Sequence, residues 1–462
     1  MTAAAATAAA TAAPSAAQSQ ARPVPPLGTP RPLRLATVSE RTLDNGLRVL
    51  AVRRPGVPLA ELRLRIPFAA PTGRGGRAYT ASAALLSDTL LSGTEQRDAA
   101  RLAADVQALG GQLSASTDAD RLGFGASVLL TGLPGLLDLL AEVLTSASYP
   151  KREVLGERDR LVQELAIYRS QASVVAREAL LARLYGDHPY GRELPSADDV
   201  AGVKPASLRT LHAQRVVPAG SILTVVGDLP PAKLLGLVES ALSGWTATSS
   251  AHETPPLPES SPGPALLLDR PGAVQTTLRM AASAPARQSP DYAAFTLANL
   301  VFGGYFSSRW VANIREDKGY TYSPHAQVEH PPAGSRVSIS ADVSTPTTAP
   351  ALLETLYELG RVATTPVSQG ELDQARRYAV GTLALGTSTQ AGLASTLSQL
   401  AGAGLGIGYL RDYPKQLAAV TVDTALEAAA RYLAPNRLTT VLVGDVSQVE
   451  APLRRLVDLE LA

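Results

Sequence analysis

Apolar and polar positions follow two periods along this chain and predict both strands and helices. Residues 62–66 alternate Leu-Arg-Leu-Arg-Ile, which is the period expected of a half-buried strand. The Asn-Gly pair at 45–46 lies between two apolar runs and predicts a tight turn joining two strands, because these residues tolerate positive φ. Helical spacing predicts helices over 80–91, 97–109 and, as one long helix, 151–184. Mixed strands and helices of this kind indicate an α+β fold.

Part of this pattern occurs twice. In each occurrence a helical stretch leads through a proline into a β-branched strand that ends in Val-Gly-Asp. Five residues recur at a constant offset of 217 positions, with Val203, Pro218 and Val226-Gly227-Asp228 repeated as Val420, Pro435 and Val443-Gly444-Asp445. A constant offset predicts a duplicated domain. We therefore expect two homologous halves, each with a mixed or antiparallel sheet packed against helices.

Composition divides the chain into four segments. Residues 1–36 are rich in Ala and Pro, lack a charged region followed by an apolar one, and are predicted to form a disordered tail. Residues 246–264 are rich in Ser, Pro, Thr and Glu, as extended linkers are. The two predicted domains are then 37–245 and 265–462. In the second domain a capping box at Ser368 and Glu371 predicts the start of a long helix.

Charge and residue usage exclude several classes of function. The 462 residues carry 42 basic and 41 acidic side chains, so no global field attracts nucleic acid or an anionic membrane. The most apolar window, 126–144, is interrupted by Gly, Pro and acidic residues, so we expect no membrane span and a cytoplasmic protein. The chain has no cysteine, and its five histidines are scattered. We predict that this chain binds no metal.

Five short motifs, taken in order and spacing, resemble the pitrilysin and insulinase family of inverted zinc peptidases, which includes the mitochondrial processing peptidase. The resemblance covers most of both predicted domains and implies their α+β fold. The motifs are Leu-Asp-Asn-Gly-Leu (43–47), Thr-Leu-Leu-Ser-Gly-Thr (89–94), Ala-Leu-Gly-Gly (108–111), His-Pro-Tyr-Gly (188–191) and a run from Phe302 to Tyr322.

The zinc site that this resemblance implies is degenerate. Active members carry His-x-x-Glu-His on a helix, where two imidazoles bind zinc and the Glu activates water, and a later helix adds a Glu ligand. Here Ala84, Ser87 and Asp88 occupy the three motif positions, and Glu164 falls at the position of the later ligand, with Glu157 two turns before it. Alternatively, Glu157 and Glu164 belong to the solvated stripe of a charged helix.

Arg315 and Tyr322 are the candidate functional pair. Residues 307–318 have helical spacing, Gly319 is placed to end that helix, and a strand is expected to begin at Tyr320, so the guanidinium and the phenol can converge. In the family that this chain resembles, such a pair binds the substrate carbonyl and stabilises the oxyanion. Alternatively, Arg315 pairs with a neighbouring carboxylate on the surface and the tyrosines pack on a sheet.

Two glycines before this pair are candidates for substrate contact. Gly303 and Gly304 would allow close approach of a substrate backbone, and a plain turn is the alternative.

The resemblance implies a non-catalytic, substrate-binding subunit of a heterodimeric zinc metallopeptidase. The partner subunit would carry His-x-x-Glu-His and the zinc, while this chain would supply Arg315 and Tyr322 to an unfolded peptide held extended along a sheet edge. One alternative is a scaffold of the same fold without peptidase activity, because the family also includes such proteins. The other alternative is an independently active peptidase with a different metal arrangement.

Overall fold

The computed structural model describes residues 36–246, 254–259 and 261–462. The predicted tail falls almost wholly outside the described residues, and so do residues 247–253 and 260 of the predicted linker. Within the described ranges, every helix is too short or too polar to cross a membrane.

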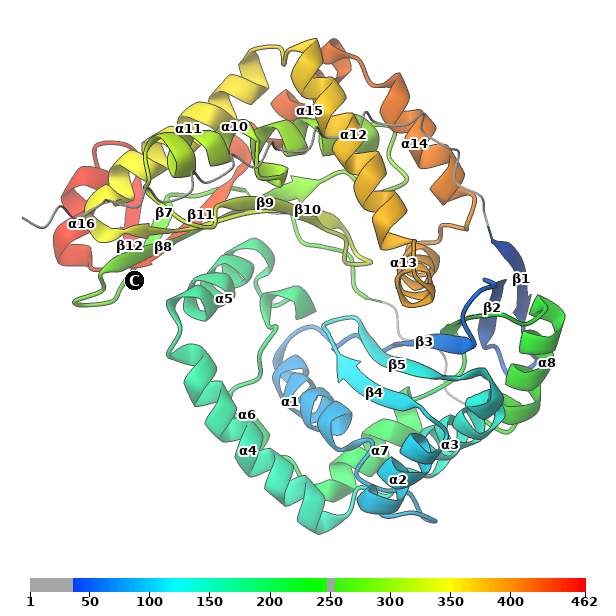
Figure 1. Ribbon diagram of the computed structural model, residues 1–462. Coiled ribbons are helices and arrows are strands. Elements are labelled where there is room, and N and C mark those ends of the chain that lie inside the picture. The colour runs from blue at the N-terminus through cyan, green and yellow to red at the C-terminus, as the bar shows by residue number, and fades with distance from the viewer. Residues whose placement is uncertain (1–35, 247–253, 260) are drawn as a thin grey trace, which may run out of the picture. The chain divides into compact units, whose positions relative to one another are not determined.

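The first half contains one sheet of six strands with helices around it (Figure 1). Its strands are β1 (Thr37–Thr42), β2 (Arg48–Arg53), β3 (Leu59–Pro67), β4 (Gln112–Thr117), β5 (Arg121–Leu129) and β6 (Ile222–Gly227). Its helices are α1 (Arg74–Thr89), α2 (Ala99–Ala108), α3 (Leu133–Ser146), α4 (Lys151–Arg169), α5 (Ala172–Tyr185), α6 (Ala197–Ala201), α7 (Pro205–Arg215) and α8 (Pro231–Leu242), with 3₁₀ turns η1 (Leu130–Gly132) and η2 (Pro189–Gly191).

The second half contains a second six-stranded sheet. Its strands are β7 (Ala265–Asp269), β8 (Gln275–Ala284), β9 (His325–Glu329), β10 (Ser335–Ser344), β11 (Thr439–Gly444) and β12 (Leu459–Leu461). Its helices are α9 (Tyr292–Asn299), α10 (Arg309–Val311), α11 (Thr348–Thr364), α12 (Gln369–Gly386), α13 (Gln390–Gly402), α14 (Tyr409–Ala419), α15 (Val422–Tyr432) and α16 (Val446–Leu453). Short turns complete it, with η3 (Leu300–Gly304) and η4 (Ala312–Asp317) π-helical and η5 (Thr345–Thr347) and η6 (Pro435–Arg437) 3₁₀.

The two sheets share the order of five of their six strands. The first runs β2-β6-β3-β5-β4 and the second β7-β11-β8-β10-β9, and in each the first pair is parallel and the others antiparallel. The sheets differ only in the added edge strand, which is antiparallel in β1 and parallel in β12. The predicted α+β fold of two homologous halves is therefore confirmed.

Two predictions that depend only on neighbouring residues are confirmed, the Asn-Gly turn and the capping box. The Asn-Gly turn joins β1 to β2 as an antiparallel pair, with Gly46 at φ 90° and the Asn45 side chain accepting a hydrogen bond from the Leu47 amide at 3.1 Å. The Ser368–Glu371 capping box opens α12, and Glu371 accepts a hydrogen bond from the Ser368 amide at 2.9 Å.

The single long helix predicted over 151–184 is wrong, because α4 ends at Arg169 and α5 begins at Ala172. The Ser170 hydroxyl donates to the Ile167 carbonyl at 2.7 Å, and Gln171 adopts extended backbone angles. A serine that bonds its own preceding turn competes with helix continuation. The break lets α5 turn away from α4.

One helix of each half packs on the sheet of the other half. Helix α5 packs on β8 and β11 of the second sheet, and α13 packs on β3 and β6 of the first (Figure 1). Apolar side chains of α5, including Leu180 and Leu184, form one core with Val441 and Val443, while Leu393 and Leu397 of α13 form another with strand residues of the first half. Strands β6 and β11 are buried along almost their whole length because helices cover both faces.

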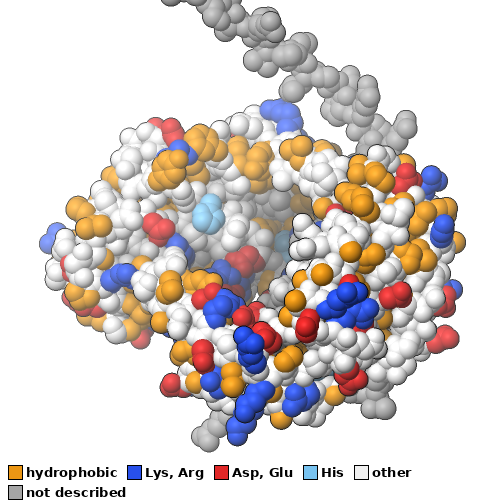
Figure 2. All heavy atoms as spheres, turned by 60° about the horizontal axis from the view of Figure 1, so that its bottom comes forward, with side chains coloured by type: hydrophobic (Ala, Val, Ile, Leu, Met, Phe, Trp, Pro, Cys, Tyr) orange, Lys and Arg blue, Asp and Glu red, His pale blue; other side chains and the backbone are white. Residues whose placement is uncertain are grey.

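An ion-pair cluster around the buried Arg336 also joins the halves. Arg336 of β10 pairs with Glu329 at 2.5 Å and with Glu193 of the first half at 3.4 Å, and Arg177 of α5 pairs with both carboxylates. Arg336 has only 5% of its side chain exposed. The face drawn in Figure 2 is hollowed, and basic and acidic side chains gather beside the hollow.

Candidate functional site

Helix α1 holds the three degenerate zinc positions. Ser87 is buried, and its hydroxyl donates to the Ala84 carbonyl at 2.8 Å and lies 3.4 Å from the Thr117 hydroxyl at the end of β4. Ala84 offers a methyl group, and Asp88 is exposed on one side. The face of α1 therefore presents one carboxylate and no imidazole.

Helix α4 brings Glu157 and Glu164 to the same place as Asp88. The loss of hydration raises the pKa of Asp88 to about 6, and the negative charge of Glu157 and, less, Glu164 adds to the rise, so the three carboxylates lie within electrostatic reach of one another. The geometry thus brings together the positions that sequence counting selected on two separate helices.

The cluster also contains a guanidinium, which pairs with both glutamates. Arg160 lies between Glu157 and Glu164 on α4 and forms ion pairs with both, and its Nε is 2.9 Å from a Glu157 oxygen. The Glu157 bond holds the pKa of Arg160 above its ordinary value. The side chains of Glu157 and Glu164 are 23% and 35% exposed, so they are half-buried rather than part of a fully solvated stripe.

These residues do not fit a zinc ion. Zinc needs three protein ligands, and in this site type two are imidazoles. Here the two glutamates already have a cationic partner, and the part of the chain that the structure describes holds no group of three His, Asp or Glu placed to bind a metal. The site in this chain is an ion-pair cluster.

The second candidate cluster lies on the second half, at the end of η4. Gly319 adopts φ 63°, and the Tyr320 amide donates to the Ile314 carbonyl at 2.8 Å, so a left-handed cap ends the helix as predicted. The expected strand does not begin at Tyr320, since β9 starts at His325. Instead, Thr321 forms a single bridge to Val343 of β10, which fixes the backbone before Tyr322.

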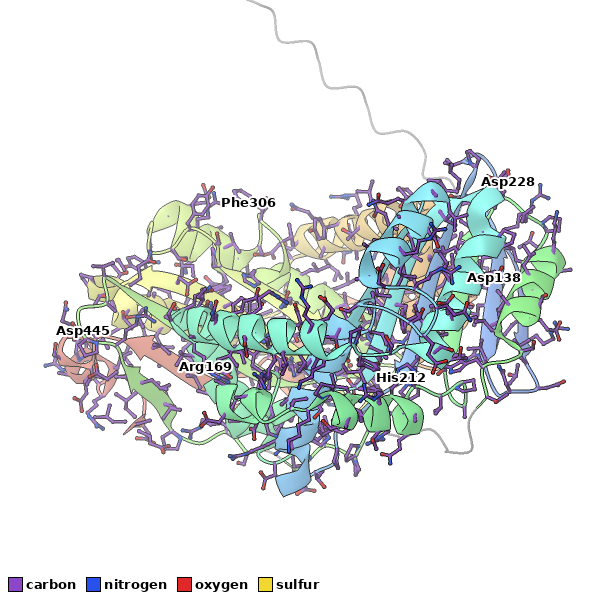
Figure 3. The ribbon with its side chains drawn as sticks, turned by 90° about the horizontal axis from the view of Figure 1, so that it is seen from below. Asp138, Arg169, His212, Asp228, Phe306 and Asp445 are labelled. Carbon is purple, nitrogen blue, oxygen red and sulfur yellow. The ribbon has the colours of Figure 1, made fainter. Side chains whose placement is uncertain are left out.

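Arg315 and Tyr322 converge, and Phe306 joins them. The Arg315 Cζ atom is 5.0 Å from the centre of the Tyr322 ring and 4.4 Å from the centre of the Phe306 ring. Both rings face solvent, with 81% of Tyr322 and 58% of Phe306 exposed, and Phe306 projects from the ribbon in Figure 3. A cavity of about 600 Å³, lined by Arg315 and Tyr322 together with Gln275 and Asp342, lies beside them.

Two family models match this sequence. The insulinase (peptidase family M16) model matches residues 81–198, and the peptidase M16 inactive domain model matches residues 202–378, which together exceed half of the chain. The chain belongs to the insulinase family, peptidase family M16. The predicted resemblance to the pitrilysin and insulinase group is thereby confirmed.

Individual M16 relatives agree with this assignment. A Mycobacterium tuberculosis protein named an uncharacterized zinc protease is 27% identical over 412 residues, which cover 87% of this chain and 92% of that protein. The crystal structure of a peptidase M16 inactive domain from Pseudomonas fluorescens superposes with a TM-score of 0.81 at 22% identity, over 88% of this chain and 98% of the other, and shows the same fold. Bovine mitochondrial cytochrome b-c1 complex subunit 1 is 24% identical over 268 residues, 57% of this chain and 55% of that protein.

Three of the five histidines of this M16 chain serve its internal structure. His188, His212 and His330 each have both ring nitrogens in hydrogen bonds, for example His212 with the Tyr149 hydroxyl at 2.7 Å and the Leu144 carbonyl at 2.9 Å. Burial lowers the pKa of His212, and burial together with nearby Arg287 lowers that of His330 to about 3. His325 is exposed, and His252 lies outside the described residues.

Internal packing restricts both glycines before Phe306. A Cβ atom at Gly303 would lie 2.9 Å from Trp310 Cε3 and 3.1 Å from Ala326 Cβ, so the close approach that glycine allows there is to its own core. At Gly304 a Cβ would meet Leu300 at 2.9 Å. Both residues end the π-helical turn η3, and their contact with substrate stays a prediction.

Sequence analysis missed Phe306 and Arg160 as members of the two clusters. Phe306 lies in a run of Gly, Tyr and Ser, and the sequence does not show that its side chain is exposed. Arg160 could have been found from its spacing, because positions three before and four after it on one helix are its surface neighbours. Both lie beside residues that the sequence did select.

Proposed function

We propose that this chain is the non-catalytic, substrate-binding subunit of a heterodimeric zinc metallopeptidase. Its Arg315 and Tyr322 would contact a peptide held at the zinc site of a partner subunit that carries His-x-x-Glu-His. The observation that carries the proposal is the exposed cluster of Arg315 with Tyr322 and Phe306 beside an open cavity.

The chemistry of this cluster suits a developing negative charge. A guanidinium is permanently charged and presents five N–H donors in a fixed plane. The two rings contact Arg315 within the distance of a cation–π interaction and hold its plane in place. Its ion-pair contact is made by Nε with Glu316 at 3.3 Å, which leaves the terminal nitrogens to donate to a substrate carbonyl.

The exposure of the cluster supports a role that needs a second molecule. Arg and Tyr are the residue types enriched in the energetic centres of interfaces, and most of the surface of Tyr322 and Phe306 is exposed to a second molecule. The α1–α4 cluster cannot supply the opposite half of a zinc site, since it has no imidazole and Arg160 pairs with both of its glutamates. A peptide substrate would lie extended along a sheet edge such as β4 or β9, where backbone groups can accept another strand.

The alternative function is a scaffold without peptidase activity. The similarity to a cytochrome b-c1 complex subunit favours this alternative, because that protein is by its name one subunit of a larger complex. A scaffold needs the fold and its surfaces but not Arg315.

Reconstitution tests the proposal. This chain is mixed with a candidate M16 partner that carries His-x-x-Glu-His, complex formation is followed by gel filtration with light scattering, and peptide cleavage is measured for the mixture and each chain alone. The proposal predicts cleavage only by the mixture, and loss of cleavage with Arg315→Ala or Tyr322→Phe although the complex still forms. If the complex forms and cleaves peptide equally well with either variant, the result would support the scaffold. A complex without any cleavage activity would support it too.

A further inference from the structure

A second cavity, of about 740 Å³, lies between the two halves of the chain and is lined by four arginines and four carboxylates. The carboxylates have partners within the chain. Asp118 pairs with Arg121 at 2.7 Å, Asp120 accepts from the Tyr190 hydroxyl at 2.7 Å, Glu193 pairs with Arg177 at 2.6 Å, and Glu329 pairs with Arg336 at 2.5 Å. The acidic groups of this cavity are therefore satisfied without a ligand.

Arg65 of β3 forms no direct ion pair, although Asp118 and Asp120 lie near enough to act on its charge. No Asp or Glu of the described residues lies within ion-pair distance of its guanidinium, although it is half-buried in the cavity wall. Burial lowers the pKa of Arg65 to about 10, and the positive charge of Arg121 adds to this shift. The negative charges of Asp118 and Asp120 offset part of it. A half-buried cation whose surroundings disfavour its charge would be stabilised by an incoming anion.

The guanidinium of Arg65 abuts the end of α13. A Cβ atom placed on Gly402 would lie 2.6 Å from Arg65 Nη2 and 2.7 Å from its Cζ, so the absence of a side chain at residue 402 gives the guanidinium its position. The carboxyl end of a helix favours a cation, and a purely structural role for Arg65 as a partner of that helix end is the competing explanation.

From the other half, Arg287 supplies a second guanidinium without a described carboxylate partner, and its Cζ atom lies 5.9 Å from the centre of the Tyr292 ring. It lines the same cavity, and no described carboxylate lies within ion-pair distance of it. The neighbouring Gln288 side chain donates to the Ala403 carbonyl, directly after the residue that Arg65 abuts. The same helix end therefore borders the loop of Arg287 and the side chain of Arg65.

We propose that this cavity is a binding site for a carboxylate group of an extended peptide, with Arg65 as the main donor and Arg287 as the second. The proposal rests on the proposed function in taking a peptide as the ligand. Guanidinium groups bind carboxylates through paired N–H donors. Asp118 and Asp120 in the same wall favour the single charge of a carboxylate over the double charge of a phosphate.

Fluorescence anisotropy with matched peptides tests the site in this chain alone. One pair has the same neutral sequence and ends in a free carboxylate or an amide, and a second pair ends in an amide and contains Glu or Gln. The proposal predicts that the carboxylate member of at least one pair binds about tenfold more tightly, with a preference that weakens as salt is added. The pair that shows the preference identifies the source as a chain terminus or a side chain.

Two variants change the site in different ways. Arg65→Gln removes the charge and should abolish the preference. Gly402→Ala keeps the charge but displaces the guanidinium, because the added Cβ meets the end of a flexible side chain, and it should weaken the preference. Arg411→Gln, at an exposed arginine paired only with Asp412, is the matched control and should leave the preference intact.

The proposal is overturned by equal binding of both members of each pair to the wild-type chain, or by a preference that survives Arg65→Gln. A marked fall in the unfolding temperature of Arg65→Gln, without loss of the preference, would establish the structural role at the end of α13. Because these measurements need no partner subunit, a failure here leaves the reconstitution test intact. Equally, if the reconstitution fails, the binding measurements on this chain alone still decide whether the cavity prefers a carboxylate.

Discussion

Replacing Arg336 by Met should destabilise this protein strongly at neutral pH and much less in acid. Arg336 has 5% and Glu329 21% of its side chain exposed, and their 2.5 Å contact joins two neighbouring strands beside the boundary between the halves. Burial alone would raise the pKa of Glu329, but Arg336 and then Arg177 outweigh burial and lower that pKa from 4.5 to about 2.

The size of the effect follows from this shift. A lowering from 4.5 to about 2 corresponds to roughly 3 kcal/mol of stabilisation that the ionised Glu329 contributes to the folded state. Because the folded pKa lies below the unfolded one, this contribution is complete above pH 4.5 and is lost as the pH falls toward 2. Met keeps a long apolar side chain, so Arg336→Met should cost about 3 kcal/mol at about pH 7.

The assay is urea unfolding followed by tryptophan fluorescence. The two tryptophans of the chain, Trp245 and Trp310, are buried in different halves and report on each. The loss caused by Arg336→Met should shrink between about pH 6 and about pH 3, since the variant can protonate Glu329. The double variant with Glu329→Gln should regain part of the loss, because it leaves no unpaired buried charge.

A control and a refuting result complete the design. Arg411→Met removes an arginine that is 60% exposed and should change the free energy of unfolding by less than about 0.5 kcal/mol. If Arg336→Met costs the same at both pH values, the loss comes from packing, and the electrostatic explanation is refuted.

Two further predictions concern the α1–α4 cluster and the packing beside η3. The pKa of Asp88 is raised from 3.8 to about 6, so the stability linked to this carboxyl is present below pH 3.8 and lost as the pH rises through 6. Asp88→Asn should therefore stabilise the protein by about 1 kcal/mol at about pH 7.5, after allowance for solvent screening of an exposed group, and not at about pH 4, as thermal unfolding at both pH values would show. Gly303→Ala would bring a methyl group against Trp310 and should cost about 1–3 kcal/mol in urea unfolding. Gly360→Ala in α11, where a Cβ meets no atom within 4 Å, should be neutral or stabilising, and an equal loss in both glycine variants would contradict this explanation.

The sequence predicted the features whose causes lie close together along the chain. The turn at Asn45–Gly46 follows from the tolerance of those residues for positive φ. The convergence of Arg315 and Tyr322 follows from a helix end, a left-handed glycine and a short extended segment, all within a few residues. The duplication was visible because two buried strands end in the same Val-Gly-Asp at a constant offset.

The features that sequence analysis missed depend on contacts between distant segments. The break after Arg169 serves the packing of α5 on strands of the other half, and a local hydrophobic pattern contains no sign of that partner. The lack of a direct ion pair at Arg65 is likewise a property of the assembled cavity wall. Phe306 joins Arg315 only because η3 and η4 place the two residues side by side.

The central claim is that Arg315 acts on a substrate at the zinc site of a partner. The most direct test is kcat for peptide cleavage by the reconstituted pair, compared between wild type, Arg315→Ala and the surface control Arg411→Ala at saturating substrate. The account predicts a fall of about 10²–10³-fold for Arg315→Ala, the loss expected for one preorganised oxyanion donor, and no change for Arg411→Ala. An unchanged kcat for Arg315→Ala in an intact complex would contradict it.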